Sequence, residues 1–279
     1  MKIKPDLPPI KDIVKRFNVS PKKSLGQNFL FDLNLTSKIV RLSGEIKGYD
    51  ILEIGPGPGC LTRSILDSGA RKVVVIEQDE RCIQVLQELK ISYPDRLTII
   101  SGDALKIDPE PFLKKPVKVI ANLPYNIGTE LLIRFLTNDG WPPYWETLTL
   151  MFQSEVAQRI TAKVGSKAYG RLSIISQWRT IASSLFSIPA TAFFPVPKVS
   201  STVVKITALP SPTYPAELKD LTSLVKIAFN QRRKMIRQSL KHLNEDIEKT
   251  LLDCGIDPTH RAEQLSIENF CQLSRALNS

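Results

Sequence analysis

Four consecutive residues combine groups suited to the chemistry of an aromatic amine. They are Asn122-Leu123-Pro124-Tyr125, directly after the apolar run at 117–121. The exocyclic amino group of adenine is a poor nucleophile because its lone pair is delocalised into the ring. It must therefore be held by acceptors that favour a tetrahedral nitrogen. The Asn122 side-chain oxygen and a main-chain carbonyl of the rigid Leu123-Pro124 segment are predicted to accept its two hydrogens, and Tyr125 to stack on the base. The alternative is an ordinary turn after a strand.

A glycine-rich loop, Gly55-Pro56-Gly57-Pro58-Gly59, follows the apolar run at 50–54. Its GxGxG spacing differs from the GxGxxG of dinucleotide folds, and Glu53 lies two residues ahead of it. A pyrophosphate gains nothing from that acid, whereas the cationic methionine end of S-adenosylmethionine tolerates its negative field. We therefore expect S-adenosylmethionine beside Gly55 and Gly57. NAD is the alternative, but it would require an acid or base at the nicotinamide, and neither histidine suits that role.

Two further acids end the next apolar runs. Glu77 is placed where a carboxylate accepts hydrogen bonds from both ribose hydroxyls, and Asp103 where one could accept from the adenine amino group. A single acid at a strand end is more often a solvated side chain. Three such acids beside one glycine loop favour a nucleoside-binding pocket.

The elements that must position these residues alternate along the chain. Continuous β-branched runs are typical of strands buried on both faces, and amphipathic stretches between them predict helices, so we expect a doubly wound parallel α/β sheet. The predicted strands are 50–54, 72–76, 97–100, 117–121 and 147–152, with 172–178 and 200–206 extending one edge. The predicted helices are 61–68, 80–93, 129–137 and 154–163.

The two ends of the chain lack the alternation of strands and helices that this middle part shows. Before it, we expect short helices at 12–17 and 33–42, joined by a basic loop at 22–30. After it, the proline-bearing segment 208–215 reads as a linker to helices at 218–229, 247–252 and 267–277. The prediction is a catalytic domain over residues 1–210, which includes the N-terminal arm, and a small all-α domain over 211–279.

Composition limits the class of protein. The chain has 279 residues with a formal charge of +10, which favours a polyanionic partner. Its four cysteines form no CxxC pair and its two histidines have no ligand-like neighbours, so we expect neither a metal site nor disulfides. No apolar run is long enough for a membrane span or a signal peptide, and a reducing cytoplasm is the expected compartment.

A basic stretch offers a place for the polyanion. Six basic residues and no acid occur between positions 226 and 241, which predicts a basic helical face suited to an RNA backbone. A solvated helix surface is the alternative. The six residues are Lys226, Arg232, Arg233, Lys234, Arg237 and Lys241, and the secondary candidates are Lys22, Lys23 and Lys198.

Most of these motifs, in order, resemble those of the KsgA-type ribosomal RNA adenine dimethyltransferases. The matching segments are 22–30 (KKSLGQNFL), 53–59 (EIGPGPG), Glu77, 102–104 (GDA), 122–125 (NLPY), 169–173 (YGRLS) and 194–201 (FPVPKVSS). The resemblance implies a Rossmann-like class I S-adenosylmethionine-dependent methyltransferase sheet. It also implies that Asn28 and Leu30 contact the cofactor and that Phe194 packs on the target base opposite Tyr125. One departure is Gly128, where relatives commonly have serine, and it is expected to affect only how the next helix is capped.

The implied activity is dimethylation of two adjacent adenosines in the 3′-terminal hairpin of small-subunit (16S) rRNA, with a role in ribosome biogenesis. The implied partner is this rRNA in the small subunit, and the protein is expected to be a monomer. Two alternatives stay open. One is a large-subunit adenine methyltransferase that confers macrolide resistance, and the other is a non-catalytic RNA-binding assembly or transcription factor on the same fold.

Overall fold

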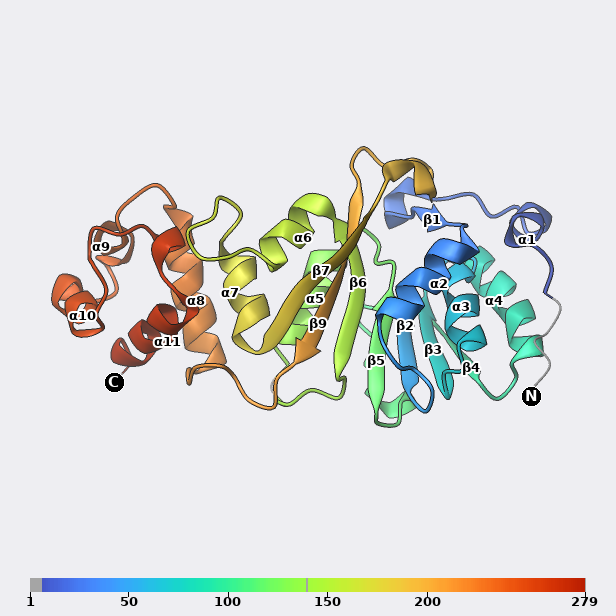
Figure 1. Cartoon of the computed structure of the whole chain (residues 1–279), viewed down its shortest axis with the longest axis horizontal. Helices are drawn as coiled ribbons and strands as arrows, with labels where there is room; N and C mark the ends of the chain where they lie inside the picture. Colours follow the sequence, from blue (N-terminus) through green and yellow to red (C-terminus); the bar gives the residue numbers. More distant parts are fainter. Residues whose placement is uncertain (1–6, 139, 279) are drawn as a thin grey trace. The chain divides into compact units, whose positions relative to one another are not determined.

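A seven-stranded sheet organises the computed structural model, which describes residues 7–138 and 140–278 (Figure 1). The strand order is β4-β3-β2-β5-β6-β9-β7. The first five strands are parallel to their neighbours, and β9 runs antiparallel to β6. The strands are β2 (Asp50–Ile54), β3 (Lys72–Glu77), β4 (Leu97–Ser101), β5 (Val117–Ala121), β6 (Thr147–Gln153), β7 (Thr180–Ile188) and β9 (Ser201–Ala208).

The strand order reverses between β2 and β5. The chain runs from β2 outward to β3 and β4, then returns to β5 on the other side of β2 and continues to β6. Both β2 and β5 are buried along their whole length, as their apolar sequences predict. The segments that leave these two strands at their carboxyl ends therefore diverge, which opens a crevice at this edge of the sheet.

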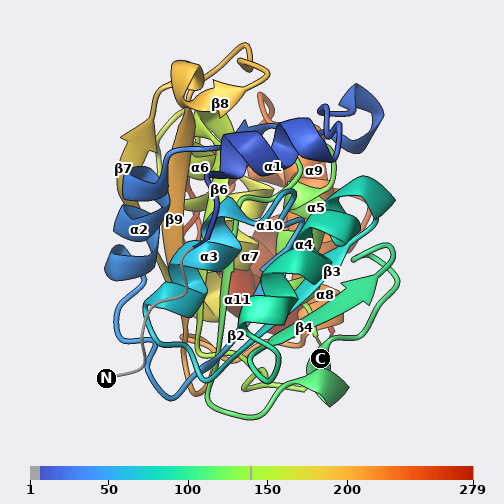
Figure 2. The same ribbon diagram turned by 90° about the vertical axis from the view of Figure 1, so that its right-hand side faces the viewer.

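Amphipathic helices cover the parallel part of the sheet. α2 (Leu33–Leu42) packs against α3 (Cys60–Asp67), and α4 (Glu80–Ser92) lies against β3 and β4 (Figure 2). Side chains such as Ile39, Ile65 and Leu86 join the strands in one core. Asp32 caps α2 and Asp79 caps α4 by accepting backbone N–H bonds, which satisfies helix-end donors. Two more helices follow strands, α5 (Gly128–Leu136) and α6 (Ser154–Ile160).

The N-terminal arm is ordered by a small sheet of its own. It contains α1 (Ile10–Arg16), the 3-10 turn η1 (Lys23–Leu25) and β1 (Phe29–Leu30). β1 pairs antiparallel with β8 (Phe193–Phe194), which joins segments more than 160 residues apart. The loop expected at 22–30 is thus fixed at its end by main-chain hydrogen bonds. The remaining 3-10 turns are η2 (Glu110–Phe112) and η3 (Ala190–Ala192) in this part and η4 (Ala262–Gln264) near the C-terminus.

A second compact unit is helical. It comprises residues 133–142, 158–182 and 208–279, of which 139 and 279 lie outside the described residues. Its core includes Tyr169, Trp178, Leu221 and Phe270, all fully or almost fully buried. Its helices are α7 (Arg171–Trp178), α8 (Leu218–Asn230), α9 (Ile236–Leu240), α10 (Ile247–Asp253) and α11 (Ile267–Ala276). Each compact unit is made of several chain segments that pack together. The domains expected from the sequence are instead two continuous ranges that divide at residue 210.

The strand expected at 172–178 is wrong, because these residues form α7. Ser173 caps the first turn of that helix: its hydroxyl accepts the Gly170 N–H (3.0 Å) and donates to the Arg159 carbonyl (2.6 Å). The buried Ile174 and Trp178 are one helical turn apart. The edge strand that the sequence analysis missed is β7, whose serine-rich exposed positions hide the apolar alternation of a strand. The sheet is therefore mixed rather than wholly parallel.

No helix in the described ranges is both long and apolar enough to cross a membrane. In the same ranges, no cluster of three histidine, cysteine or acidic side chains is placed to hold a metal ion.

Replacing Gly128 with alanine is expected to stabilise the protein by about 0.4–1 kcal/mol, since alanine restricts the unfolded chain and suits the first turn of α5. A Cβ there would lie 3.5 Å from the Leu123 Cβ, an ordinary contact. Urea unfolding measures the change. Gly57→Ala is the contrasting variant, because Gly57 has a φ of +55° and a Cβ would lie 2.9 Å from the Phe29 ring. The expectation fails if Gly128→Ala unfolds at lower urea than the parent.

Candidate active site

A cleft lies at the carboxyl ends of the strands, where the strand order reverses. Its empty volume, which includes space open to solvent, is about 770 Å³. Among the predicted site residues, those that line it are Asn28, Leu30, Gly55, Gly57, Glu77, Asn122, Leu123 and Pro124. Asp103, Tyr125 and Phe194 do not line it.

The glycine loop is a cradle in which side chains have no room. Gly55 and Gly57 have φ angles of +64° and +55°, values that side-chain-bearing residues rarely adopt. A Cβ on Gly55 would lie 3.1 Å from the Pro124 ring, and one on Gly57 would lie 2.9 Å from the Phe29 ring. The two glycines thus allow β1, the loop after β2 and the turn after β5 to approach one another closely.

Glu77 ties the end of β3 to that loop. Its Oε2 accepts the Gly57 N–H (3.1 Å), and its Oε1 accepts the N–H groups of Gln78 and Asp79 (2.9 Å each). Burial raises the pKa of Glu77, while these three backbone bonds lower it. A carboxylate offers about four acceptor sites, so roughly one remains for a ligand hydroxyl rather than the two expected from the sequence.

The structure gives the Glu53 carboxyl group a different protonation state from the one expected from the sequence. Its side chain is 1% exposed and accepts one hydrogen bond from the Thr62 hydroxyl (2.7 Å). Burial raises the pKa of Glu53 to about 8, and the nearby Glu77 adds to the increase. The carboxyl group is therefore mostly protonated at neutral pH and does not supply the negative field that was expected ahead of the glycine loop.

Asp103 caps a turn instead of facing the cleft. Its Oδ1 accepts the Leu105 N–H (2.9 Å), and Lys106 Nζ lies 3.9 Å from its Oδ2. The flanking residues Gly102 and Ala104 line the cleft, although Asp103 does not. In this structure Gly102 and Ala104, and not Asp103, belong to that wall.

Asn122 is held with its amide at the cleft wall. The amide nitrogen donates to the Asn28 carbonyl (2.9 Å), and the Asn28 amide nitrogen donates to the Gly26 carbonyl (3.3 Å). This chain of bonds connects the N-terminal loop to the turn after β5. This bond fixes the orientation of the Asn122 amide. Among the described residues, none donates to its oxygen, which is therefore open to accept a hydrogen bond.

The turn also decides which main-chain carbonyl is available. The Pro124 carbonyl accepts the N–H groups of Ile127 (3.2 Å) and Gly128 (3.0 Å), which begins α5. In the described part of the chain, no backbone N–H donates to the Leu123 carbonyl. Of the two carbonyls left open by the sequence, that of Leu123 is the one free to accept.

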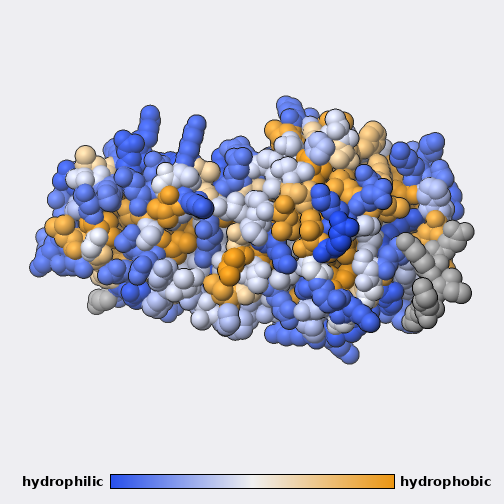
Figure 3. All heavy atoms as spheres, in the orientation of Figure 1, coloured by the Kyte–Doolittle hydropathy of each residue, from blue (hydrophilic) through white to orange (hydrophobic). Residues whose placement is uncertain are grey.

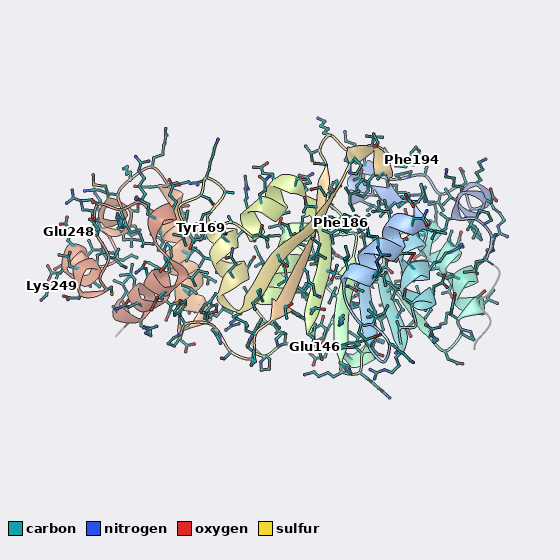
Figure 4. All side chains as sticks on the ribbon, viewed as in Figure 1. Glu146, Tyr169, Phe186, Phe194, Glu248 and Lys249 are labelled. Atoms are coloured by element: carbon teal, nitrogen blue, oxygen red, sulfur yellow. The ribbon has the colours of Figure 1, made fainter. Side chains whose placement is uncertain are left out.

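Tyr125 and Phe194, the two aromatic residues predicted to hold the base, differ in how their side chains are held. The Tyr125 hydroxyl bonds the Ser201 hydroxyl (2.5 Å), and burial raises the Tyr125 pKa. Phe194 is 55% exposed, lies on β8 (Figure 4) and has its ring 6.4 Å from that of Phe31. More than half of the Phe194 side chain is therefore exposed to solvent, whereas the Tyr125 side chain is held by the hydrogen bond of its hydroxyl.

Gln27 and Asp79 were missed by the sequence analysis. Gln27 lines the cleft, donates to Asp79 (3.1 Å) and accepts the Lys22 N–H (2.8 Å). The Arg81 side chain bonds the Asp79 carboxylate and lowers its pKa to about 2, so this anchor is an anion at neutral pH. The only sequence signal was the place of Gln27 inside the matching segment 22–30.

The basic stretch is not one helical face. α8 ends at Asn230 and α9 begins at Ile236, so the stretch covers two short helical pieces and a turn. Arg232 pairs with Glu263 (2.7 Å) and Arg237 with Glu248 (3.1 Å), acids distant in sequence. Both arginines thus help to hold the helical unit together. On the face drawn in Figure 3, this unit shows hydrophilic residues with hydrophobic areas between them.

Glu53→Gln should change the pH dependence of stability. A carboxyl with an ordinary pKa of 4.5 when unfolded and about 8 when folded gives stability that is present below pH 4.5 and lost as pH rises to about 8. Glutamine does not titrate, so the variant should gain on the parent between pH 5 and 8 in urea unfolding. Glu130→Gln, at an exposed position, is the control. A constant difference across this pH range would exclude the proposed protonation.

Known proteins are similar to this chain in both sequence and fold. A family model described as ribosomal RNA adenine dimethylase matches residues 18–279. Ribosomal RNA small subunit methyltransferase A of Ruegeria sp. (strain TM1040) is 57% identical over 272 residues, which cover 98% of this chain and 97% of that protein. The protein of that name from Roseobacter denitrificans is 57% identical over 271 residues, 97% of each chain.

Solved structures agree with the fold. A dimethyladenosine transferase from Plasmodium falciparum has a TM-score of 0.72 at 24% identity, over 88% of this chain and 95% of that one. The 23S rRNA methyltransferase ErmE has a TM-score of 0.69 at 25% identity, over 90% of this chain and all of that one. The expected class I methyltransferase sheet is thereby confirmed, and the chain belongs to the ribosomal RNA adenine dimethylase family of enzymes.

Proposed function

We propose that this enzyme transfers methyl groups from S-adenosylmethionine to the 6-amino groups of two adjacent adenosines in the 3′-terminal hairpin of small-subunit rRNA. The observation that carries the proposal is the position of Asn122 and the Leu123 carbonyl, two open acceptors on the wall of the cleft that also contains the glycine loop. The small-subunit substrate follows the printed names of relatives that are more than half identical over nearly the whole chain.

The cradle suits a nucleoside with a phosphate-free tail. Gly55 and Gly57 would let the main chain approach the ligand closely, because they have no side chains. Glu77 would have about one acceptor site left for a ligand hydroxyl. Bound S-adenosylmethionine would supply an electrophilic methyl group on a sulfonium. Glu53 lies behind the loop, and a nearby positive charge would favour its ionised form over the neutral one that burial favours.

The transfer needs orientation more than acid or base. Asn122 and Leu123 would accept the two amino hydrogens, which localises the nitrogen lone pair toward the methyl group. The amine proton becomes acidic once the new bond forms, so water or phosphate can remove it. Tyr125 would stack on the extruded base, a contact worth about 1–3 kcal/mol in nucleic-acid binders. Phe194 is proposed to cover its other face.

The rest of the molecule would hold the RNA. Extruding a base costs a few kcal/mol, which contacts to the phosphates must recover. Arg233 and Lys234 in the turn before α9 are exposed and are proposed to bind the RNA backbone, with Lys22, Lys23 and Lys198 in the catalytic unit as further contacts. We propose that the enzyme acts as a monomer in the cytoplasm, on the small ribosomal subunit.

Asn122→Ala is expected to lower the rate of methyl transfer at least a hundredfold, in line with the loss of one preorganised group at a transition state. The measurement is mass spectrometry of the rRNA hairpin after incubation with labelled cofactor. Asn34→Ala, at an exposed position on α2, is the matched control. Transfer at the parent rate by Asn122→Ala would remove the basis of the mechanism.

Purified subunits separate the alternatives in the same assay. Label in the small subunit alone supports the proposal, and label in the large subunit would support the macrolide-resistance activity. Cofactor binding by the parent protein without transfer to either subunit would support a non-catalytic assembly factor.

Glu77→Gln should weaken the binding of S-adenosylmethionine roughly tenfold or more. A glutamine oxygen accepts fewer than the three N–H bonds that Glu77 now accepts, and its amide group would face donors, so the Gly57 main chain would shift. Isothermal titration calorimetry with S-adenosylmethionine measures the loss, and Glu130→Gln again serves as the control. Unchanged affinity would show that Glu77 does not shape the cofactor site.

A further inference from the structure

The Tyr125 ring is tied to a distant strand by its hydroxyl. Its oxygen lies 2.5 Å from the hydroxyl oxygen of Ser201, the first residue of β9. Ser201 is fully buried and stands opposite Gln153 of β6 in the antiparallel ladder. A serine fixed in this way by the sheet is a rigid point of attachment for the more exposed tyrosine.

The Ser201 hydroxyl serves Tyr125 alone within the described part of the chain. Its neighbours in the sequence bond elsewhere: the Ser200 and Thr202 hydroxyls lie 3.0 and 3.1 Å from that of Ser154. A buried hydroxyl that loses its partner is costly, so the bond between Ser201 and Tyr125 favours one arrangement of both side chains.

The geometry of tyrosine determines what this bond fixes. The hydroxyl lies on the long axis of the ring, so the bond fixes the direction of that axis, while packing sets the rotation about it. At the other end, the main chain is held by the Pro124 carbonyl, which accepts two N–H bonds at the start of α5. Both ends of Tyr125 are thus located before any base arrives, which lowers the ordering cost of stacking.

On the basis of the proposed function, we propose that Ser201 is a positioning residue: its hydroxyl holds the Tyr125 ring where the extruded adenine stacks. Ser201 itself touches neither the base nor the cofactor. Its contribution is to the alignment of the adenine with Asn122 and the Leu123 carbonyl.

The test compares Ser201→Ala, Tyr125→Phe and the double variant of the full chain, using small ribosomal subunits and labelled S-adenosylmethionine. Each single variant should lower kcat about fivefold to tenfold, the effect of losing one hydrogen bond at a reaction site. The double variant should lose no more than either single, because the same bond is removed. The KM for S-adenosylmethionine should not change. Ser200→Ala removes an adjacent hydroxyl that bonds Ser154 and should behave as the parent protein.

Three results would overturn the proposal: full activity of Ser201→Ala, losses that multiply in the double variant, or an equal loss of cofactor affinity. If Ser201→Ala fails to fold, Tyr125→Phe decides alone, because it removes the bond and keeps the serine. Failure of the parent protein to methylate the subunit would instead contradict the proposed function, so the two outcomes are distinguishable.

Discussion

The reversal of strand order between β2 and β5 is the constraint on which the site depends. Parallel strands deliver their carboxyl ends to one edge of the sheet, and connections that leave adjacent strands in opposite directions cannot fill the space between them. The loop that starts at Gly55 and the turn that starts at Asn122 leave from these two strands. The place of the cleft therefore follows from topology, and the side chains decide what the cleft accepts.

Pro124 connects the two walls of that cleft. Its ring packs on Gly55, where a Cβ would lie within 3.1 Å, and its carbonyl begins α5 by accepting two N–H groups. Pro124 thus holds the turn close to the glycine loop, and its carbonyl takes the two N–H bonds while the Leu123 carbonyl accepts none from the described backbone. Asn122 adds a second link by donating to the Asn28 carbonyl, which also brings the N-terminal loop to the site. The acceptors for an amine and the cradle for a cofactor are parts of one rigid assembly.

Burial changes the meaning of charged residues that looked equivalent in the sequence. Glu53 and Glu77 are both nearly inaccessible, but Glu53 accepts one hydroxyl bond and Glu77 accepts three backbone bonds. In the helical unit, Arg232 and Arg237 pair with acids, whereas Arg233 and Lys234 in the intervening turn stay exposed. The six basic residues between positions 226 and 241 therefore overstate the unpaired positive charge that this stretch offers to a polyanion.

Local sequence determined the parallel strands, most of the helices and the positions of the two motifs, because apolar periodicity, glycine spacing and proline act within a few residues. It failed at α7, where an apolar run resembles a strand although Ser173 caps the first turn of a helix, and at β7, whose polar exposed face conceals its pairing. Tertiary structure alone decided that Asn122 meets Asn28, that Ser201 meets Tyr125 and that burial raises the pKa of Glu53. These facts depend on partners far apart in the chain and on burial, which only the assembled fold establishes.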